Sequence, residues 1–171
     1  MLASQAFERR QVVLSSGKTS NYYFDGRKVS LNPRGAYLIA NIICDMIEGE
    51  RVDAVGGLTL GADPIVGALG VVAYQRNMDI TLFIVRKEPK KHGTMRLIEG
   101  PPLEAGQRVV LVDDVITSGG SILKAVRAVR ELDCQVVKAI ALVDRQEGGT
   151  EALEREGVRV EAVFRALEFD I

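Results

Sequence analysis

The stretch RVVLVDDVITSGGS, Arg108–Ser121, carries the strongest structural signal in the sequence. An uninterrupted apolar run ends in two adjacent acids, Asp113 and Asp114, and a turn rich in hydroxyl groups and glycines follows. A continuous run of Val and Leu predicts a strand that is buried on both faces, which is typical of parallel sheets. The apolar spacing after the turn predicts a helix. The stretch therefore indicates one strand–turn–helix unit of an α/β protein.

The rest of the chain repeats this alternation. Asn32 and Pro33 supply an N-cap and a first-turn proline for a helix that Gly49 ends. Helical spacing recurs at 63–74, 118–132 and 149–157. Continuous apolar runs predict strands at 52–57, 79–86, 108–114, 135–144 and 158–164. We therefore expect one domain, residues 1–171, with a central parallel sheet of about five strands flanked by helices.

The composition argues against several classes of function. The chain has 171 residues, of which 47% are hydrophobic and 26% charged, and its net charge is −1. A nearly neutral protein has no overall attraction to nucleic acid or to an anionic membrane. The sequence contains neither a transmembrane run nor a secretory signal. We expect a cytoplasmic protein that binds no nucleic acid and no membrane, with Cys44 and Cys134 as unpaired structural thiols.

The turn after the acids is suited to binding phosphate. The first N–H groups of a helix have no partner within the helix, and the positive end of its dipole attracts anions. Thr117, Ser118 and Ser121 add hydroxyl donors, while Gly119 and Gly120 let a ligand approach the backbone closely. The spacing matches neither a P-loop nor a Rossmann fingerprint. The turn therefore predicts a phosphate site of another kind.

Asp113 and Asp114 suit a different part of the same ligand. Adjacent carboxylates accept hydrogen bonds from neighbouring hydroxyls, such as those of a ribose, and they are also suitable ligands for Mg²⁺. A hydroxyl pair one sugar away from a phosphate describes a ribose 5-phosphate. The alternative is a helix whose dipole the two acids stabilise without any ligand. Two acids in register with the TSGGS turn favour the ligand.

This stretch resembles the signature of the type I phosphoribosyltransferases, which bind phosphoribosyl pyrophosphate through it. The resemblance implies the type I phosphoribosyltransferase fold with a small N-terminal hood, to which residues 1–32 contribute. It also implies a requirement for Mg²⁺, held mainly by phosphoribosyl pyrophosphate, with Asp113 or Asp114 as a candidate ligand. The residues implied to bind phosphoribosyl pyrophosphate here are Asp113, Asp114, Val115, Ile116, Thr117, Ser118, Gly119, Gly120 and Ser121.

A second unusual stretch is RKEPKKHGTMRLIEG, Arg86–Gly100, which follows a predicted strand. Five basic residues and one acid lie between Arg86 and Arg96, and Pro89 and Gly93 disfavour a regular helix or strand. A solvated charged loop would need no ligand. A phosphate turn is expected at the same edge of the sheet. The positive charge of this stretch is therefore better explained by binding of a polyanion. The chain's only histidine, His92, lies within this basic loop.

The basic loop resembles that of the orotate phosphoribosyltransferases, whose pattern is Arg-Lys-x-x-Lys-x-His-Gly followed later by Glu-Gly. The stretches VDRQEGG, Val143–Gly149, and LSSGKTSNYYFDGR, Leu14–Arg27, resemble the same family. The resemblance implies that Thr117 and Arg145 bind orotate, and the planar fork of an arginine suits its carboxylate. It further implies contacts to pyrophosphate from Arg86, Lys87, Lys90 and His92, and catalytic roles for Lys90, His92, Asp113 and Asp114.

The family implies transfer of a 5-phosphoribosyl group to orotate in de novo pyrimidine synthesis, by a homodimer whose basic loop reaches the neighbouring site. The chain departs from some bacterial relatives at Thr19, Leu60 and Gly61. Lys18, one place before Thr19, is a candidate substitute, and the backbone of Thr59–Ala62 is a candidate contact to pyrophosphate. One alternative is a phosphoribosyltransferase for another base, such as a purine. The other is a regulator of the same fold that senses phosphoribosyl pyrophosphate and binds RNA or a repressor. The balanced charge gives the regulator little support.

Overall fold

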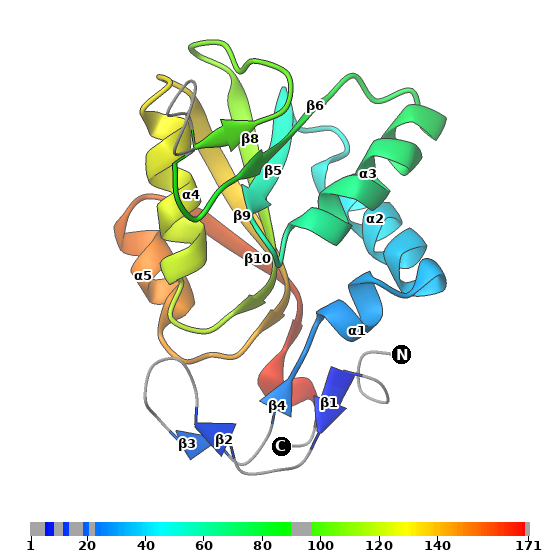
Figure 1. The fold of residues 1–171 in the computed structure, drawn as a ribbon, viewed down its shortest axis with the longest axis vertical. Helices are drawn as coiled ribbons and strands as arrows, with labels where there is room; N and C mark the ends of the chain where they lie inside the picture. Colours follow the sequence, from blue (N-terminus) through cyan, green and yellow to red (C-terminus); the bar gives the residue numbers. More distant parts are fainter. Residues whose placement is uncertain (1–5, 9–11, 14–18, 21–22, 90–96, 170–171) are drawn as a thin grey trace.

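The computed structural model describes residues 6–8, 12–13, 19–20, 23–89 and 97–169, and these residues form a central six-stranded sheet of order β10-β9-β8-β5-β6-β7 (Figure 1). Strand β7 (Ile98–Glu99) is short and pairs antiparallel with β6. The other five strands run parallel. They are β5 (Ala54–Leu58), β6 (Thr81–Val85), β8 (Arg108–Ile116), β9 (Gln135–Asp144) and β10 (Arg159–Arg165). The predicted parallel α/β sheet is confirmed, with one antiparallel strand added at its edge.

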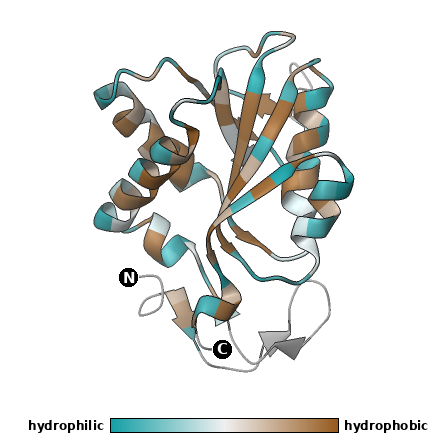
Figure 2. Cartoon of the chain, turned by 180° about the vertical axis from the view of Figure 1, so that it is seen from behind, coloured by the Kyte–Doolittle hydropathy of each residue, from teal (hydrophilic) through white to brown (hydrophobic). Residues whose placement is uncertain are grey.

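Helices cover both faces of the sheet (Figure 1). Because successive strand residues point to opposite faces, Val110 and Val112 pack toward α2 and α3, whereas Val109 and Leu111 pack toward α4 and α5. Figure 2 shows the resulting apolar strands between helices with polar outer faces. No helix in the described part of the chain is long and apolar enough to cross a membrane. The helices are α2 (Pro33–Ile47), α3 (Asp63–Gln75), α4 (Gly120–Arg130) and α5 (Gly149–Arg155).

Helix α2 begins where the sequence predicts. The side chain of Asn32 accepts hydrogen bonds from the backbone N–H groups of Arg34 (3.1 Å) and Gly35 (3.2 Å), and Pro33 occupies the first helical position. These contacts satisfy two of the donors that a helix leaves unpaired at its start. Gly49 follows the helix with φ +77°, a conformation that glycine adopts without strain.

Short N-terminal segments lie beyond the carboxyl ends of the parallel strands (Figure 1). The ring of Phe169 holds them to the sheet, because its centroid lies 6.3 Å from that of Phe7, 6.4 Å from that of Phe24 and 5.7 Å from that of Phe164. Phe169 ends a 3₁₀ turn that directly follows β10. The segments are β1 (Phe7–Glu8) paired with β4 (Tyr23–Phe24), β2 (Val12–Val13) paired with β3 (Thr19–Ser20), and α1 (Arg27–Ser30).

Both cysteines are buried and unpaired, as the sequence predicts. Cys44 packs in the core on the α2 side of the sheet, and Cys134 packs on the α4 side. Burial raises the pKa of both thiols above the usual value. Both groups therefore behave as neutral packing residues.

Candidate active site

Strand β8 places Asp113 and Asp114, hereafter the acid pair, at the carboxyl edge of the sheet. Asp113 is 6% exposed and lies opposite Ala141 of β9. Its Oδ1 accepts a hydrogen bond of 3.0 Å from the backbone N–H of Asp114. Burial, and then the charge of Asp114, raise the pKa of Asp113 well above its usual value. Burial also raises the pKa of Asp114, and the nearby Arg27 opposes that shift. In the ligand-free protein the negative charges of the acid pair are therefore only weakly stabilised by their surroundings.

The backbones of two glycines lie directly against the acid pair. A Cβ at Gly61 would lie 2.2 Å from Oδ1 of Asp113 and 2.7 Å from Oδ1 of Asp114. A Cβ at Gly26 would lie 2.8 Å from Cβ of Asp114. Neither position has room for a side chain without movement of the carboxylates. The acid pair thus lies between the turn after β5 and the end of the N-terminal segments.

The turn after β5 is fixed by hydrogen bonds at its first residue. The backbone N–H of Thr59 donates to the carbonyl of Val85 at the end of β6, at 2.8 Å. Its hydroxyl donates to Oδ2 of Asp63 in the first turn of α3, at 2.7 Å. These contacts hold Leu60 and Gly61 beside the acid pair, where the predicted backbone site for pyrophosphate would lie.

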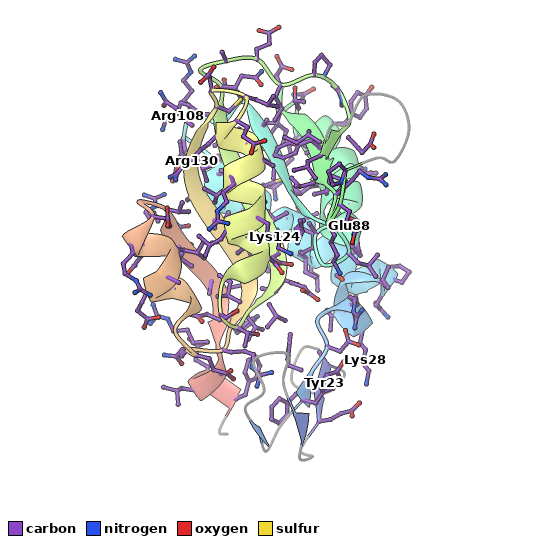
Figure 3. The ribbon with its side chains drawn as sticks, turned by 60° about the vertical axis from the view of Figure 1, so that its left-hand side comes forward. Tyr23, Lys28, Glu88, Arg108, Lys124 and Arg130 are labelled. Carbon is purple, nitrogen blue, oxygen red and sulfur yellow. The ribbon has the colours of Figure 1, made fainter. Side chains whose placement is uncertain are left out.

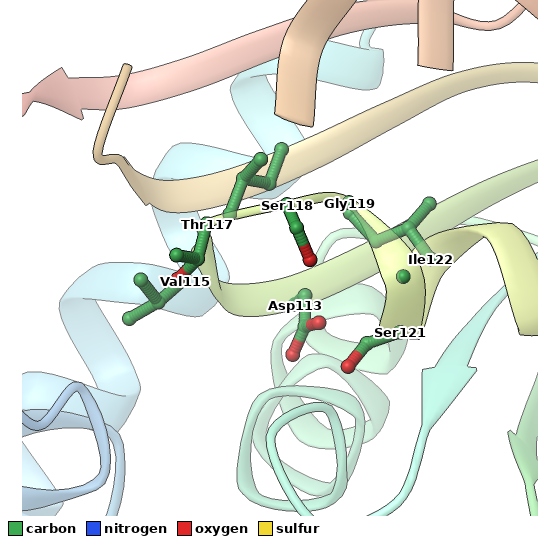
Figure 4. Close-up of a pocket in the computed structure, with 9 residues that line it drawn as sticks. Asp113, Val115, Thr117, Ser118, Gly119, Ser121 and Ile122 are labelled. Atoms are coloured by element: carbon green, nitrogen blue, oxygen red, sulfur yellow. The ribbon is translucent and has the colours of Figure 1, made fainter. Parts of the chain in front are cut away.

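The turn between β8 and α4 encloses a cavity of about 100 Å³ (Figure 4). Gly119, with φ +79°, gives the turn its left-handed residue. A Cβ there would lie 2.9 Å from the carbonyl oxygen of Gly149, so the turn packs backbone to backbone on the start of α5. The lining contains the whole predicted phosphate turn. It consists of Asp113, Val115, Ile116, Thr117, Ser118, Gly119, Gly120, Ser121 and Ile122.

A second cavity, of about 260 Å³, shares Asp113, Val115, Thr117 and Ser121 with the first. The two cavities therefore form one continuous site at the carboxyl ends of the strands, where α/β sheets bind ligands. Its remaining lining comes from five separate parts of the chain. These residues are Phe24, Asp25, Arg27, Leu58, Thr59, Leu60, Gly61, Lys87, Asp114 and Arg145.

Arg145 enters this second cavity from the end of β9. Its backbone N–H donates to the carbonyl of Ile116 at 2.9 Å, which ties it to the phosphate turn. Its Nε donates to Oε1 of Glu147 at 2.8 Å, and its side chain is only 4% exposed. The guanidinium is thus fixed in place on the cavity wall. The structure brings Thr117 and Arg145 to the same cavity, as the sequence predicts for the two residues.

The chain is similar to known proteins over nearly its whole length. The phosphoribosyl transferase domain family matches residues 33–161. The chain is 45% identical to the orotate phosphoribosyltransferase of Nostoc sp., over 98% of the chain and 81% of the relative, and 46% identical to that of Aquifex aeolicus, over 91% and 84%. A structure of Mycobacterium tuberculosis orotate phosphoribosyltransferase with 5-phospho-alpha-D-ribosyl 1-diphosphate (PRPP) superposes with a TM-score of 0.80, at 36% identity over 99% and 94% of the two chains. The chain belongs to the orotate phosphoribosyltransferases.

The basic loop that pointed to the orotate phosphoribosyltransferases is described only at its two ends. Lys87 lines the second cavity, and its charge lowers the pKa of Asp113. Arg86 instead forms an ion pair of 3.4 Å with Glu99 of β7 and is not part of the cavity lining. Lys90 and His92 lie outside the described residues. Their roles stay predictions.

The acid pair fits the Mg²⁺ that the family implies. Among the described residues, no group of three or more His, Cys, Asp or Glu is placed to hold a metal ion by itself. Mg²⁺ commonly binds one or two carboxylates together with the phosphates of a substrate. Two carboxylates beside a phosphate turn suit a metal that arrives with its ligand, with Asp113 or Asp114 as one contact.

Sequence reasoning missed two charged residues of this orotate phosphoribosyltransferase site. Asp25 and Arg27 line the second cavity beside the acid pair, although they precede it by more than 80 positions. The sequence offered one signal, an acid and an arginine two residues apart after an aromatic strand. Their position beside Asp114 could not be predicted, because only the folded sheet brings the two segments together.

Proposed function

We propose that this chain transfers the 5-phosphoribosyl group of phosphoribosyl pyrophosphate to orotate, giving orotidine 5′-phosphate and pyrophosphate. One observation carries the proposal: the acid pair, the phosphate turn and the buried Arg145 line one continuous site. Full-length similarity to named orotate phosphoribosyltransferases supports the same reaction. The enzyme works in the cytoplasm, in the de novo synthesis of UMP.

The phosphate turn binds the 5-phosphate of the substrate. The first N–H groups of α4 and the hydroxyls of Thr117, Ser118 and Ser121 surround the cavity at that turn. The carboxylates of Asp113 and Asp114 accept hydrogen bonds from the two ribose hydroxyls. Such bonds stabilise the charged form of a carboxylate, so they offset the burial that raises both pKa values in the free enzyme.

Arg145 and Thr117 bind orotate. A buried arginine whose side chain Glu147 orients binds the planar orotate carboxylate with little further ordering. Thr117, the first residue of the phosphate turn, lines the same cavity as Arg145. Uracil, which lacks the carboxylate, leaves the guanidinium without its partner and binds weakly for that reason.

The reaction is a displacement at the anomeric carbon. A ring nitrogen of orotate forms the new bond to this carbon while the bond to the pyrophosphate oxygen breaks. Positive charge grows on the sugar beside Asp113 and Asp114, and negative charge grows on the leaving group. Arg86, Lys87, Lys90 and His92 stabilise the leaving group, together with the backbone of Thr59–Ala62. When bound, Mg²⁺ supplies further positive charge to the pyrophosphate oxygens.

The enzyme is a homodimer in which the basic loop reaches the site of the neighbouring subunit. Support comes from apolar side chains that α2 and α3 expose, among which Tyr74 is 84% exposed. Mixing inactive Lys90→Ala and Asp114→Asn dimers tests this arrangement. Since half of the dimers would be hybrids with one intact site of two, about a quarter of the wild-type activity should return. No recovery of activity would contradict shared sites.

Steady-state assays with orotate, uracil, hypoxanthine and adenine test the choice of base. We expect turnover of orotate alone, and only when both phosphoribosyl pyrophosphate and Mg²⁺ are present. Product formation from a purine without turnover of orotate would replace the proposed reaction by that of another phosphoribosyltransferase. Binding of phosphoribosyl pyrophosphate without turnover of any base would favour the regulator.

A further inference from the structure

The segment that joins β4 to α1 brings a cation into the site that the basic loop does not supply. Arg27 lines the same cavity as Lys87, Asp113 and Asp114. Its side chain is 42% exposed, so the guanidinium is open to solvent and to a ligand. The backbone just before it packs directly on the acid pair, because Gly26 leaves no room for a Cβ beside Asp114.

Asp25 holds the guanidinium of Arg27 in one orientation. Nε of Arg27 donates to Oδ1 of Asp25 at 2.8 Å, and Nη2 donates to Oδ2 at 3.2 Å, which is the two-point geometry that arginine forms with carboxylates. Asp25 is itself fixed, since its backbone N–H donates to the carbonyl of Ala6 at 2.9 Å. Within the described residues, Nη1 of Arg27 makes no hydrogen bond, so this donor stays available.

Each carboxylate of the acid pair has a cation near it. Burial raises the pKa of both acids, and the charge of Lys87 opposes this shift at Asp113 as that of Arg27 does at Asp114, so each acid has its own cation on the cavity wall. In the described part of the chain Arg27 makes no direct ion pair with Asp114, so it acts on this carboxylate across the cavity. A substrate oxygen fits between the two, because a sugar hydroxyl donates to a carboxylate and accepts from a guanidinium at once.

The Asp25–Arg27 ion pair is partly open to solvent, with side chains 18% and 42% exposed, and such a pair contributes at most about 1 kcal/mol to stability, so it has little structural value. The cavity, in contrast, must admit a strongly anionic sugar diphosphate although three acids line it. A pre-oriented donor reduces the ordering that binding requires.

Resting on the function proposed above, we infer that Arg27 is a binding residue for phosphoribosyl pyrophosphate, held by Asp25 to donate to a substrate oxygen beside Asp114. Lys28 provides the contrast. It is the next residue of α1 and carries the same charge; Figure 3 labels its side chain. Lys28 pairs with Glu8 of β1 and is not part of the cavity lining. Removal of either charge changes the net charge of the protein equally, and only Arg27 should affect the substrate.

Titration calorimetry with phosphoribosyl pyrophosphate and Mg²⁺, in the absence of orotate, tests the inference. We expect Arg27→Gln to weaken binding roughly ten- to hundredfold, the range for a lost hydrogen bond to a charged group. Asp25→Asn should give a smaller loss because the guanidinium remains but is no longer held. Lys28→Gln should bind within about twofold of wild type, because a rim charge outside the site contributes little. The KM for orotate should be the same in all four proteins.

Three outcomes would overturn the inference: wild-type affinity in Arg27→Gln, an equal loss in Lys28→Gln, or a change confined to the KM for orotate. Should circular dichroism show Arg27→Gln unfolded, Arg27→Lys decides instead. It keeps the charge beside Asp25 but loses the planar fork, so we expect about a fivefold loss, and wild-type affinity would refute the role of Arg27. If the wild-type protein itself does not bind phosphoribosyl pyrophosphate, the result contradicts the proposed function and not the specific role of Arg27.

Discussion

Two groups of buried charge lie on the neighbouring strands β8 and β9, and only one of them is satisfied within the described residues. The satisfied group, hereafter the Lys138 cluster, consists of Lys138, Glu50, Arg159 and Glu161. The Lys138 side chain is 1% exposed, and its Nζ donates to the carbonyl of Met46 (2.6 Å), to Oε1 of Glu50 (3.0 Å) and to Oε2 of Glu161 (3.1 Å). All three protons of the ammonium group are therefore used.

The acid pair differs in every one of these respects. Two like charges are adjacent, burial raises both pKa values, and the cations Lys87 and Arg27 stand across a cavity rather than in contact. The Lys138 cluster ties the end of α2 to β9 and β10, whereas the acid pair keeps acceptors open for a ligand. This fold therefore pairs its buried charges where they hold elements together, and it leaves buried charges unpaired where a substrate binds.

The largest expected effect is on catalysis. Asp114→Asn should lower kcat/KM for phosphoribosyl pyrophosphate by at least about a hundredfold, because the variant loses a charged acceptor beside the developing positive charge. Initial rates at saturating orotate would measure this. Turnover within threefold of wild type would show that the acid pair does not contact the sugar.

Lys138→Met should affect stability and spare catalysis. Removing one member of a buried ion pair costs about 3–5 kcal/mol, and the partly exposed carboxylates here reduce the cost to about 2 kcal/mol. For a chain of this length the melting temperature should fall by about 4–8 °C, while kcat per folded enzyme stays unchanged.

Arg159→Gln is the matched control for this variant, because Arg159 pairs with the same carboxylates at the surface. Calorimetric scans of both variants should show a much smaller shift for Arg159→Gln. Equal shifts in melting temperature would show that the buried ammonium group of Lys138 contributes no more to stability than the exposed guanidinium of Arg159.

Gly61→Ala should damage the site without unfolding the protein. Its Cβ would lie 2.2 Å from Oδ1 of Asp113, so the carboxylate or the turn must move. We expect kcat/KM for phosphoribosyl pyrophosphate to fall about tenfold, the cost of about 1.4 kcal/mol of lost binding. The control is Gly67→Ala in α3, where a Cβ meets nothing within 4 Å. This control should keep full activity and gain up to about 1 kcal/mol of stability.

The smallest predicted effect is a difference in how stability depends on pH. The pKa of Asp113 is raised, so its favourable contribution is complete below the unfolded value near 4 and is lost as pH rises through the folded value. The stability of Asp113→Asn relative to wild type should therefore increase from pH 4 to neutral pH. Lys138 lowers the pKa of Glu50, so the advantage of wild type over Lys138→Met should decline as pH falls below about 4.5.

Urea unfolding of the two ligand-free pairs at several pH values measures both slopes. A fall in the relative stability of Asp113→Asn with rising pH would contradict the raised pKa. A constant difference for Lys138→Met would show that Glu50 does not depend on the ammonium group.

Local patterns predicted much of this molecule. The N-cap at Asn32, the strand predicted at 108–114 and the turn before α4 depend on neighbours in sequence, and all three are present. The strand extends two residues beyond the predicted end, to Ile116. The antiparallel strand β7 was missed because two residues carry no periodicity. Lys138 lies in a strand that was predicted as an apolar run. Its hydrogen-bond partners come from the end of α2 and from β10, which are distant in sequence, so the cluster could not be predicted. Arg27 and Gly61 reach the acid pair through contacts that no local pattern encodes.

Urea unfolding of Asp113→Asn at neutral pH, together with orotate turnover by the same preparation, tests whether the acid pair serves the substrate at a cost to the stability of the fold. If the acid pair is kept for the substrate at a cost to the fold, the variant should unfold at a higher urea concentration with an unchanged m-value, and its turnover should be lost. A variant that loses stability and turnover together would contradict the account, because the acid pair would then be part of what holds the fold.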